Sequence, residues 1–124
     1  MSERKRVLVA DDDPGLRLLA LEVLTEMGHE VVVATDGLEA WRQLEAGRFD
    51  LILVDEAMPG LAGTEVVARA RSGGTRTPAV LWSGHAMLSV RERSELGIVA
   101  VLRKPVRIER LAQTLHAALR QDEP

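Results

Sequence analysis

Five short apolar runs, spaced along the whole chain, restrict its fold more than any other feature of the sequence. They occupy residues 7–10, 31–34, 51–54, 79–82 and 99–102. Each run is nearly continuous and rich in β-branched residues, a pattern typical of parallel strands that are covered on both faces. The spacing therefore predicts five buried strands.

The segments between these runs carry the 3.6-residue period of amphipathic helices. Apolar side chains step by three and four, most clearly in the first and the last segment. The apolar positions of the five expected helices fall within residues 16–27, 38–44, about 63–71, about 88–96 and 108–119. The third and fourth helices have thin apolar faces.

Local signals mark the ends of the first two helices. Asp13 followed by Pro14 is typical of an N-cap and a first helical position. Gly28 stands where a C-terminal glycine belongs. Asp36 and Glu39 have the spacing of a capping box, which predicts that the second helix begins just after Asp36.

Strands that alternate with helices predict an α/β fold of three layers, αβα, around a five-stranded parallel sheet. The 124 residues, of which 46% are hydrophobic, suffice for one domain with an ordinary core. Right-handed crossovers place the C-terminal ends of all strands on one edge of the sheet, where such folds bind ligands. A binding site is therefore expected among the residues that follow the strands.

Composition excludes several classes of function. The chain has no cysteine, which rules out disulfides, thiol chemistry and cysteine-zinc sites. Its net charge of −3 and its scarcity of aromatic residues argue against nucleic-acid binding. No apolar run approaches the roughly 20 residues of a membrane span, and no leader peptide is recognisable. We expect a soluble cytoplasmic protein that contacts neither nucleic acid nor a membrane directly.

Polar side chains follow four of the predicted strands. Asp11 and Asp12 follow the first, Asp55 the third, Ser83 the fourth and Lys104 the fifth. Carboxylates that converge repel one another unless they are protonated or neutralised. Oxygen ligands without histidine or cysteine suit a hard cation such as Mg²⁺, and the first turn lacks the glycine-rich phosphate cradle of nucleotide-binding folds. The sequence therefore predicts a metal site that could accept phosphate through the metal.

Such a site can support phosphoryl chemistry. One of the carboxylates could attack phosphorus and form an aspartyl phosphate. Phosphoryl transfer depends mainly on positioning and on charge neutralisation. The metal would neutralise one phosphoryl oxygen and Lys104 a second, while the Ser83 hydroxyl would donate a hydrogen bond to the third.

Four stretches of the chain together resemble one family. They comprise residues 7–14, 50–60, 79–84 and 102–106, in this order and at these spacings. With them the chain resembles, from end to end, a response-regulator receiver domain of two-component signalling. The resemblance implies a flavodoxin-like sheet with the strand order 2-1-3-4-5.

The resemblance also implies a phosphoacceptor and its metal ligands. Asp55 matches the phosphoacceptor aspartate. Asp11 and Asp12 match the acidic pair that holds Mg²⁺, with Asp12 preferred as a direct ligand. Ala57 matches the position whose backbone carbonyl completes the metal site together with Asp55.

Further matches and one departure concern the last two strands. Ser83 matches the switch Ser/Thr, and Lys104 matches the lysine that contacts the phosphoryl group. The family's Lys-Pro bond is typically cis, and the same is expected between Lys104 and Pro105. The family often carries Tyr or Phe where this chain has Val101, so the usual coupling to an inward-turning aromatic ring cannot operate here.

We therefore expect a Mg²⁺-dependent phosphorylation switch rather than an enzyme with a turnover substrate. A sensor histidine kinase or a phosphotransfer protein would donate the phosphoryl group from phosphohistidine to Asp55. An unidentified downstream protein would read the altered surface. Because only residues 121–124 follow the last helix, a stand-alone domain, 1–124, is expected, with homodimerisation as a further possibility.

Two alternative functions belong to other classes. A metal-dependent phosphatase with an aspartyl nucleophile would carry a second aspartate two residues after it, where this chain has Ala57. A scaffold that binds partners without phosphorylation would have no need of the acidic pair, Asp55 and Lys104.

Other residues near the strands receive structural interpretations. Asp50 is interpreted as a capping or turn residue. Trp82 alternates away from Ser83 along its strand, so it is expected in the core, as is Trp41. His85 is interpreted as a loop residue with no fixed task.

Overall fold

The computed structural model describes residues 3–84 and 88–120, so His85 lies outside the described residues. The strands are β1 (Arg6–Ala10), β2 (Glu30–Ala34), β3 (Leu51–Asp55), β4 (Ala79–Ser83) and β5 (Ile98–Arg103). They form one parallel sheet in the order β2-β1-β3-β4-β5. The predicted α/β architecture and the strand order 2-1-3-4-5 are confirmed.

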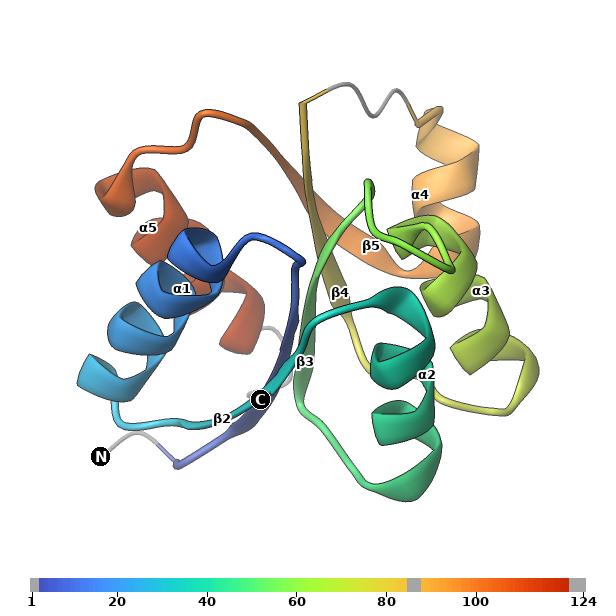
Figure 1. The fold of residues 1–124 in the computed structure, drawn as a ribbon, viewed down its shortest axis with the longest axis horizontal. Helices are drawn as coiled ribbons and strands as arrows, with labels where there is room; N and C mark the ends of the chain where they lie inside the picture. The colour runs from blue at the N-terminus through green and yellow to red at the C-terminus, as the bar shows by residue number, and fades with distance from the viewer. Residues whose placement is uncertain (1–2, 85–87, 121–124) are drawn as a thin grey trace.

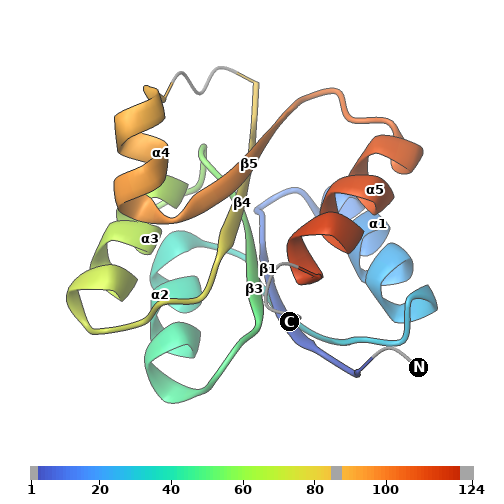
Figure 2. The ribbon, with the colours of Figure 1, turned by 180° about the vertical axis from the view of Figure 1, so that it is seen from behind.

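The helices cover both faces of the sheet. They are α1 (Pro14–Glu26), α2 (Gly37–Ala46), α3 (Gly63–Ser72), α4 (Val90–Leu96) and α5 (Ile108–Leu119). Helices α1 and α5 lie together on one face, and α2, α3 and α4 lie on the other (Figure 1). The view from behind shows the same three layers (Figure 2). Within the described ranges, no helix has the length and apolar character that crossing a bilayer requires.

Side chains alternate between the two faces along each strand and build two apolar clusters. On β1, Val7 and Val9 belong to the cluster under α1 and α5. Leu8 and Ala10 belong to the cluster under α2, α3 and α4. The central strands are buried, as the continuous apolar runs predicted. The strand β2 differs, since Val33 is 39% exposed, because β2 lies at the edge of the sheet with one neighbouring strand.

The caps of α1 and α2 follow the signals in the sequence. Asp13 caps α1, and its Oδ1 accepts a hydrogen bond from the Gly15 amide at 2.8 Å. Asp36 caps α2, and its Oδ1 accepts one from the Glu39 amide at 2.8 Å. The Glu39 carboxylate differs from the expected capping box, because it accepts a hydrogen bond from the Thr35 hydroxyl at 3.3 Å.

Helix α4 begins two residues later than its apolar pattern indicated. The Ser89 hydroxyl accepts a hydrogen bond from the Glu92 amide at 3.0 Å, and the Glu92 carboxylate accepts one from the Ser89 amide at 3.2 Å. This capping box sets the first helical residue at Val90. No residue of α4 is buried and Val90 is 84% exposed, in agreement with the thin apolar face.

Candidate functional site

The C-terminal ends of four strands meet at one edge of the sheet, and each brings a polar side chain there. Asp11 follows β1, Asp55 ends β3, Ser83 ends β4 and Lys104 follows β5. Because β1 and β3 are neighbours, Asp11 and Asp55 lie side by side. The Lys104 amide donates a hydrogen bond to the Ser83 carbonyl at 3.0 Å, which extends the pairing of β4 with β5 by one residue.

Three carboxylates form an acidic cluster at this edge. One oxygen each of Asp11, Asp12 and Asp55 lies within 4.8 Å of the others. Asp11 is fully buried and Asp55 is 3% exposed, whereas Asp12 lies at the surface. A donor set of carboxylate oxygens, open to solvent on one side, fits a hard cation that keeps some of its water, such as Mg²⁺.

Lys104 places an ammonium against the two buried carboxylates. Its Nζ lies 3.2 Å from Asp11 Oδ2 and 3.2 Å from Asp55 Oδ1. The bond between Lys104 and Pro105 is cis, as expected. One ammonium beside three carboxylates leaves the edge with an excess of negative charge.

Burial and charge shift the pKa values of these groups. Burial is the main cause of the raised pKa of the Asp11 carboxyl, and repulsion by the Asp55 carboxylate raises this pKa further. The hydrogen bond from the Asp13 amide and the charge of Lys104 lower it, but not enough to cancel the rise. Burial alone would lower the pKa of Lys104, but the two carboxylates outweigh it and raise that pKa. Lys104 therefore stays charged, while the ionised form of Asp11 is disfavoured in the absence of a further cation.

The loop that follows Asp55 is held by several hydrogen bonds. The Ala57 amide donates to Asp55 Oδ1 at 3.3 Å, which places Ala57 beside the carboxylate. The Glu56 amide donates to the Trp82 carbonyl at 3.2 Å. The Glu56 carboxylate accepts hydrogen bonds from the Thr64 amide at 2.7 Å and the Thr64 hydroxyl at 2.9 Å. A carboxylate is favourable there because Thr64 lies in the first turn of α3.

Gly63, the first residue of α3, lets this helix approach the backbone of Asp55 closely. A Cβ at Gly63 would lie 2.4 Å from the Asp55 carbonyl oxygen. The Gly63 amide donates to the Glu56 carbonyl at 3.1 Å. Sequence reasoning assigned neither Glu56 nor Gly63 to the site, because only the three-dimensional approach of α3 to β3 gives them a role.

The remaining predicted residues lie at the same edge or apart from it. Ser83 is 5% exposed at the end of β4, between β3 and β5. Val101 is half-buried and packs into the cluster under α2, α3 and α4. Arg17 was not predicted as a site residue, but its Nη1 donates a hydrogen bond to the Asp11 carbonyl at 2.8 Å. The sequence indicates this contact only through the position of Arg17, one turn into the helix that follows Asp11.

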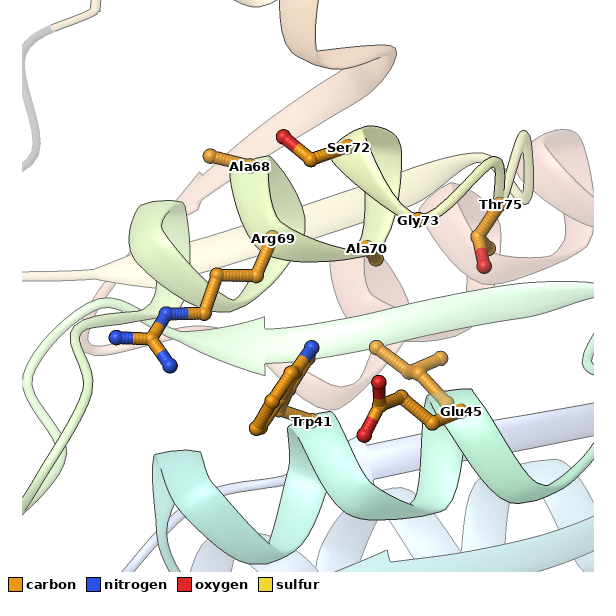
Figure 3. A pocket seen from close by; sticks show the side chains of 9 residues that line it. Trp41, Glu45, Ala68, Arg69, Ala70, Ser72, Gly73 and Thr75 are labelled. Carbon is orange, nitrogen blue, oxygen red and sulfur yellow. The ribbon is translucent and has the colours of Figure 1, made fainter.

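A cavity of about 660 Å³ lies between α2 and α3. Trp41 and Glu45 line it from α2 and Arg69 lines it from α3 (Figure 3). The Arg69 guanidinium lies over the Trp41 ring, 5.2 Å from its centroid. Trp41 packs against the core, as expected, but is only half-buried. No residue of the acidic cluster lines this cavity, so it is separate from the candidate metal site.

Comparison with known proteins identifies relatives along nearly the whole chain. The family model described as response regulator receiver domain matches residues 7–116. The transcriptional regulatory protein TcrA of Mycobacterium tuberculosis is 32% identical over 117 residues, which are 94% of this chain and 46% of TcrA. The chain thus spans about half the length of this curated relative.

Solved structures share the fold. The chemotaxis protein CheY4 of Vibrio cholerae has a TM-score of 0.83 and 30% identity, covering 94% of this chain and 99% of that one. The response regulator protein TrrA of Thermotoga maritima was solved in complex with Mg²⁺-BeF. It has a TM-score of 0.76 and 30% identity, and the match covers 92% of this chain and 98% of TrrA. The chain, with its acidic edge and its 2-1-3-4-5 sheet, belongs to the response regulator receiver domain family of two-component signalling.

Proposed function

We propose that Asp55 accepts a phosphoryl group in a Mg²⁺-dependent switch. The observation that carries this proposal is the acidic cluster itself. Oxygens of Asp11, Asp12 and Asp55 lie within 4.8 Å of one another, and the Lys104 ammonium lies 3.2 Å from two of these residues. This arrangement places a carboxylate nucleophile beside one positive charge, the Lys104 ammonium, and beside oxygens that could hold a second, Mg²⁺; both would neutralise the phosphoryl oxygens during transfer.

The metal ligands in this proposal are Asp11, Asp12, Asp55 and the backbone carbonyl of Ala57. The hydrogen bond from the Ala57 amide to Asp55 supports the last of these, because it places Ala57 next to the carboxylate. Mg²⁺, when bound, supplies positive charge that offsets the carboxylates and the incoming phosphoryl oxygens. The similarity to TrrA, which was solved in complex with Mg²⁺-BeF, supports Mg²⁺ as the cation.

The other steps belong to side chains of this chain. A carboxylate oxygen of Asp55 bonds to phosphorus as the phosphorus–nitrogen bond of a phosphohistidine donor breaks. The electron pair of that bond stays on the donor imidazole, which takes a proton from solvent. Lys104 then pairs with a phosphoryl oxygen, and the Ser83 hydroxyl donates a hydrogen bond to another. These new contacts bias the surface that a partner recognises.

We propose a sensor histidine kinase or a phosphotransfer protein as donor and a downstream protein as reader, in the cytoplasm and without direct nucleic-acid contact. Dimerisation of the phosphorylated chain is a further part of this proposal. That residues 1–124 act as a stand-alone domain stays a prediction, since TcrA is about twice as long as the matched region. A phosphatase reaction is disfavoured, because the methyl side chain of Ala57 cannot serve as its general acid.

The test is labelling with acetyl phosphate in the presence of MgCl₂, followed by intact-mass measurement. We expect one added phosphoryl group, which Asp55→Asn abolishes. Asp36→Asn is the matched control, because Asp36 also follows a strand but caps α2, and asparagine is an equally good cap. Persistent labelling of Asp55→Asn would contradict the assignment of the phosphoacceptor.

Removal of the metal tests the other half of the proposal. With EDTA in place of MgCl₂, we expect the labelling rate to fall by about 100-fold or more, because the charge of the cluster is then uncompensated. Excess MgCl₂ should restore the rate. An equal rate with and without EDTA would rule out the metal role.

A further inference from the structure

The Lys104 ammonium has a third neighbour besides the two carboxylates. Its Nζ lies 5.5 Å from the centroid of the Trp82 ring. Trp82 is the last residue before Ser83 in β4, and the pairing of strands places it beside Asp55 on β3 and Leu102 on β5. The ammonium therefore has carboxylates on one side and an aromatic ring on another.

Trp82 is the one aromatic residue in the described part of its apolar cluster. It has no exposed surface, and it lies in the cluster under α1 and α5, which is otherwise built from aliphatic side chains. Its Nε1 is buried and has no hydrogen-bond partner among the described residues. A buried donor without a partner costs free energy. A phenylalanine would fill much of the same space without that cost.

The indole does offer one thing that an aliphatic side chain cannot. Among aromatic side chains, tryptophan attracts a cation to its ring face most strongly, and the attraction grows as water is excluded. Lysine has a flexible four-carbon stem, so its ammonium needs contacts that hold it in place. The two carboxylates alone do not limit the position of Nζ on the side where the ring lies.

We propose that Trp82 is a positioning residue whose indole face holds the Lys104 ammonium beside Asp11 and Asp55, ready for an incoming phosphoryl group. The part that concerns phosphoryl transfer rests on the function proposed above. The contact itself does not, since it is present before any phosphoryl group arrives. Trp82 acts only through Lys104 and touches none of the reacting atoms.

The proposal separates stability from labelling rate. Trp82→Phe keeps a weaker ring, so the rate of labelling by acetyl phosphate for the folded protein should fall about threefold. Its effect on the unfolding midpoint should be small, because the loss of the unpartnered donor offsets part of the lost core volume. Trp82→Leu removes the ring, and the rate for the folded protein should fall about tenfold. Leu115→Ala removes apolar volume from the same cluster and should lower stability without lowering that rate. If Trp82→Phe lowers stability but leaves the rate unchanged, the tryptophan is only a core residue and the proposal is wrong.

Fluorescence tests the contact independently of phosphorylation. In a Trp41→Phe background, Trp82 is the remaining tryptophan of the chain. Lys104→Met, with Lys104→Gln as a second variant in case the first does not fold, should change the Trp82 emission spectrum in the absence of metal and phosphodonor. Identical spectra with and without the lysine would overturn the proposal. If wild type is not labelled but the spectra differ, the proposed function fails and the contact stands.

Discussion

At the C-terminal edge of the sheet, two buried carboxylates share the ammonium of Lys104. At the N-terminal edge, by contrast, the side chain and the backbone amide of Arg6 donate hydrogen bonds to three separate acceptors. Arg6 Nε lies 3.0 Å from Glu30 Oε2, and Nη1 donates to the Arg48 carbonyl at 3.0 Å. The Arg6 amide donates to Asp50 Oδ2 at 2.8 Å. Each carboxylate at this second edge therefore has a donor of its own.

The two edges differ in how deeply their carboxylates are buried and in whether these carboxylates share one donor group, rather than in residue type. Carboxylates at the N-terminal edge are partly solvated and paired, so this network needs no ligand to be stable. At the C-terminal edge, negative charge exceeds positive charge in a buried place, which is costly until a cation binds. A protein can accept such a cost where the site has a function.

The largest effect is expected at Gly63, where α3 approaches Asp55. Gly63→Ala places a methyl group 2.4 Å from a backbone oxygen, which should lower the free energy of unfolding by about 2–3 kcal/mol. Urea denaturation measures this loss. Gly73→Ala, just after the other end of the same helix, is the control. Its methyl group would lie 3.6 Å from the Ala70 carbonyl oxygen, an ordinary contact, and should change stability by about 0.5 kcal/mol or less. Equal losses in both variants would mean that close packing against Asp55 is not what makes Gly63 necessary.

Two aspartate substitutions compare the edges directly, in EDTA at neutral pH. Asp50→Asn weakens a charge-assisted hydrogen bond to the Arg6 amide and should lower stability by about 1–2 kcal/mol. Asp11→Asn should instead raise stability, by less than about 1 kcal/mol. The reason is that the pKa of Asp11 is raised on folding, so its stabilising contribution is present at acid pH and lost as pH rises through that raised pKa. Chemical denaturation measures the change in the free energy of unfolding for both variants. If both substitutions raise stability, or both lower it, the contrast between the two edges is wrong.

The smallest effect concerns His29 at the N-terminal edge. Burial lowers the pKa of His29 below its ordinary value of 6.5, and the charge of Lys5 adds to this. The Lys5 amide donates to Nδ1 at 3.0 Å, so protonation of Nδ1 would remove the acceptor. The contribution of neutral His29 to the free energy of unfolding should be fully present above about pH 6.5. It should be lost as the pH drops through the lowered pKa, and the loss should be less than about 1 kcal/mol. Denaturation curves at several pH values should show this fall in wild type and a smaller one in His29→Gln; parallel profiles would exclude His29 as the cause.

Much of the fold could be predicted because its signals are local. The continuous apolar runs identify the buried strands, and Asp13 and Asp36 mark the helix starts through hydrogen bonds to residues two or three positions away. The start of α4 was predicted two residues early, because the apolar pattern includes Leu88 while the Ser89 cap decides where the helix begins. The exposure of Val33 was also missed, since an apolar run does not tell an edge strand from a central one.

By itself, the sequence determined which residue types end each strand and therefore which chemistry the C-terminal edge could carry. Only the tertiary structure decided how those residues meet: Lys104 against Asp11 and Asp55, the Trp82 ring beside the ammonium, and Gly63 against the Asp55 backbone. The physical reason is range. Hydrophobic periods and caps act over a few residues, whereas these contacts join distant parts of the chain, through a sheet order and a helix approach that side-chain packing selects.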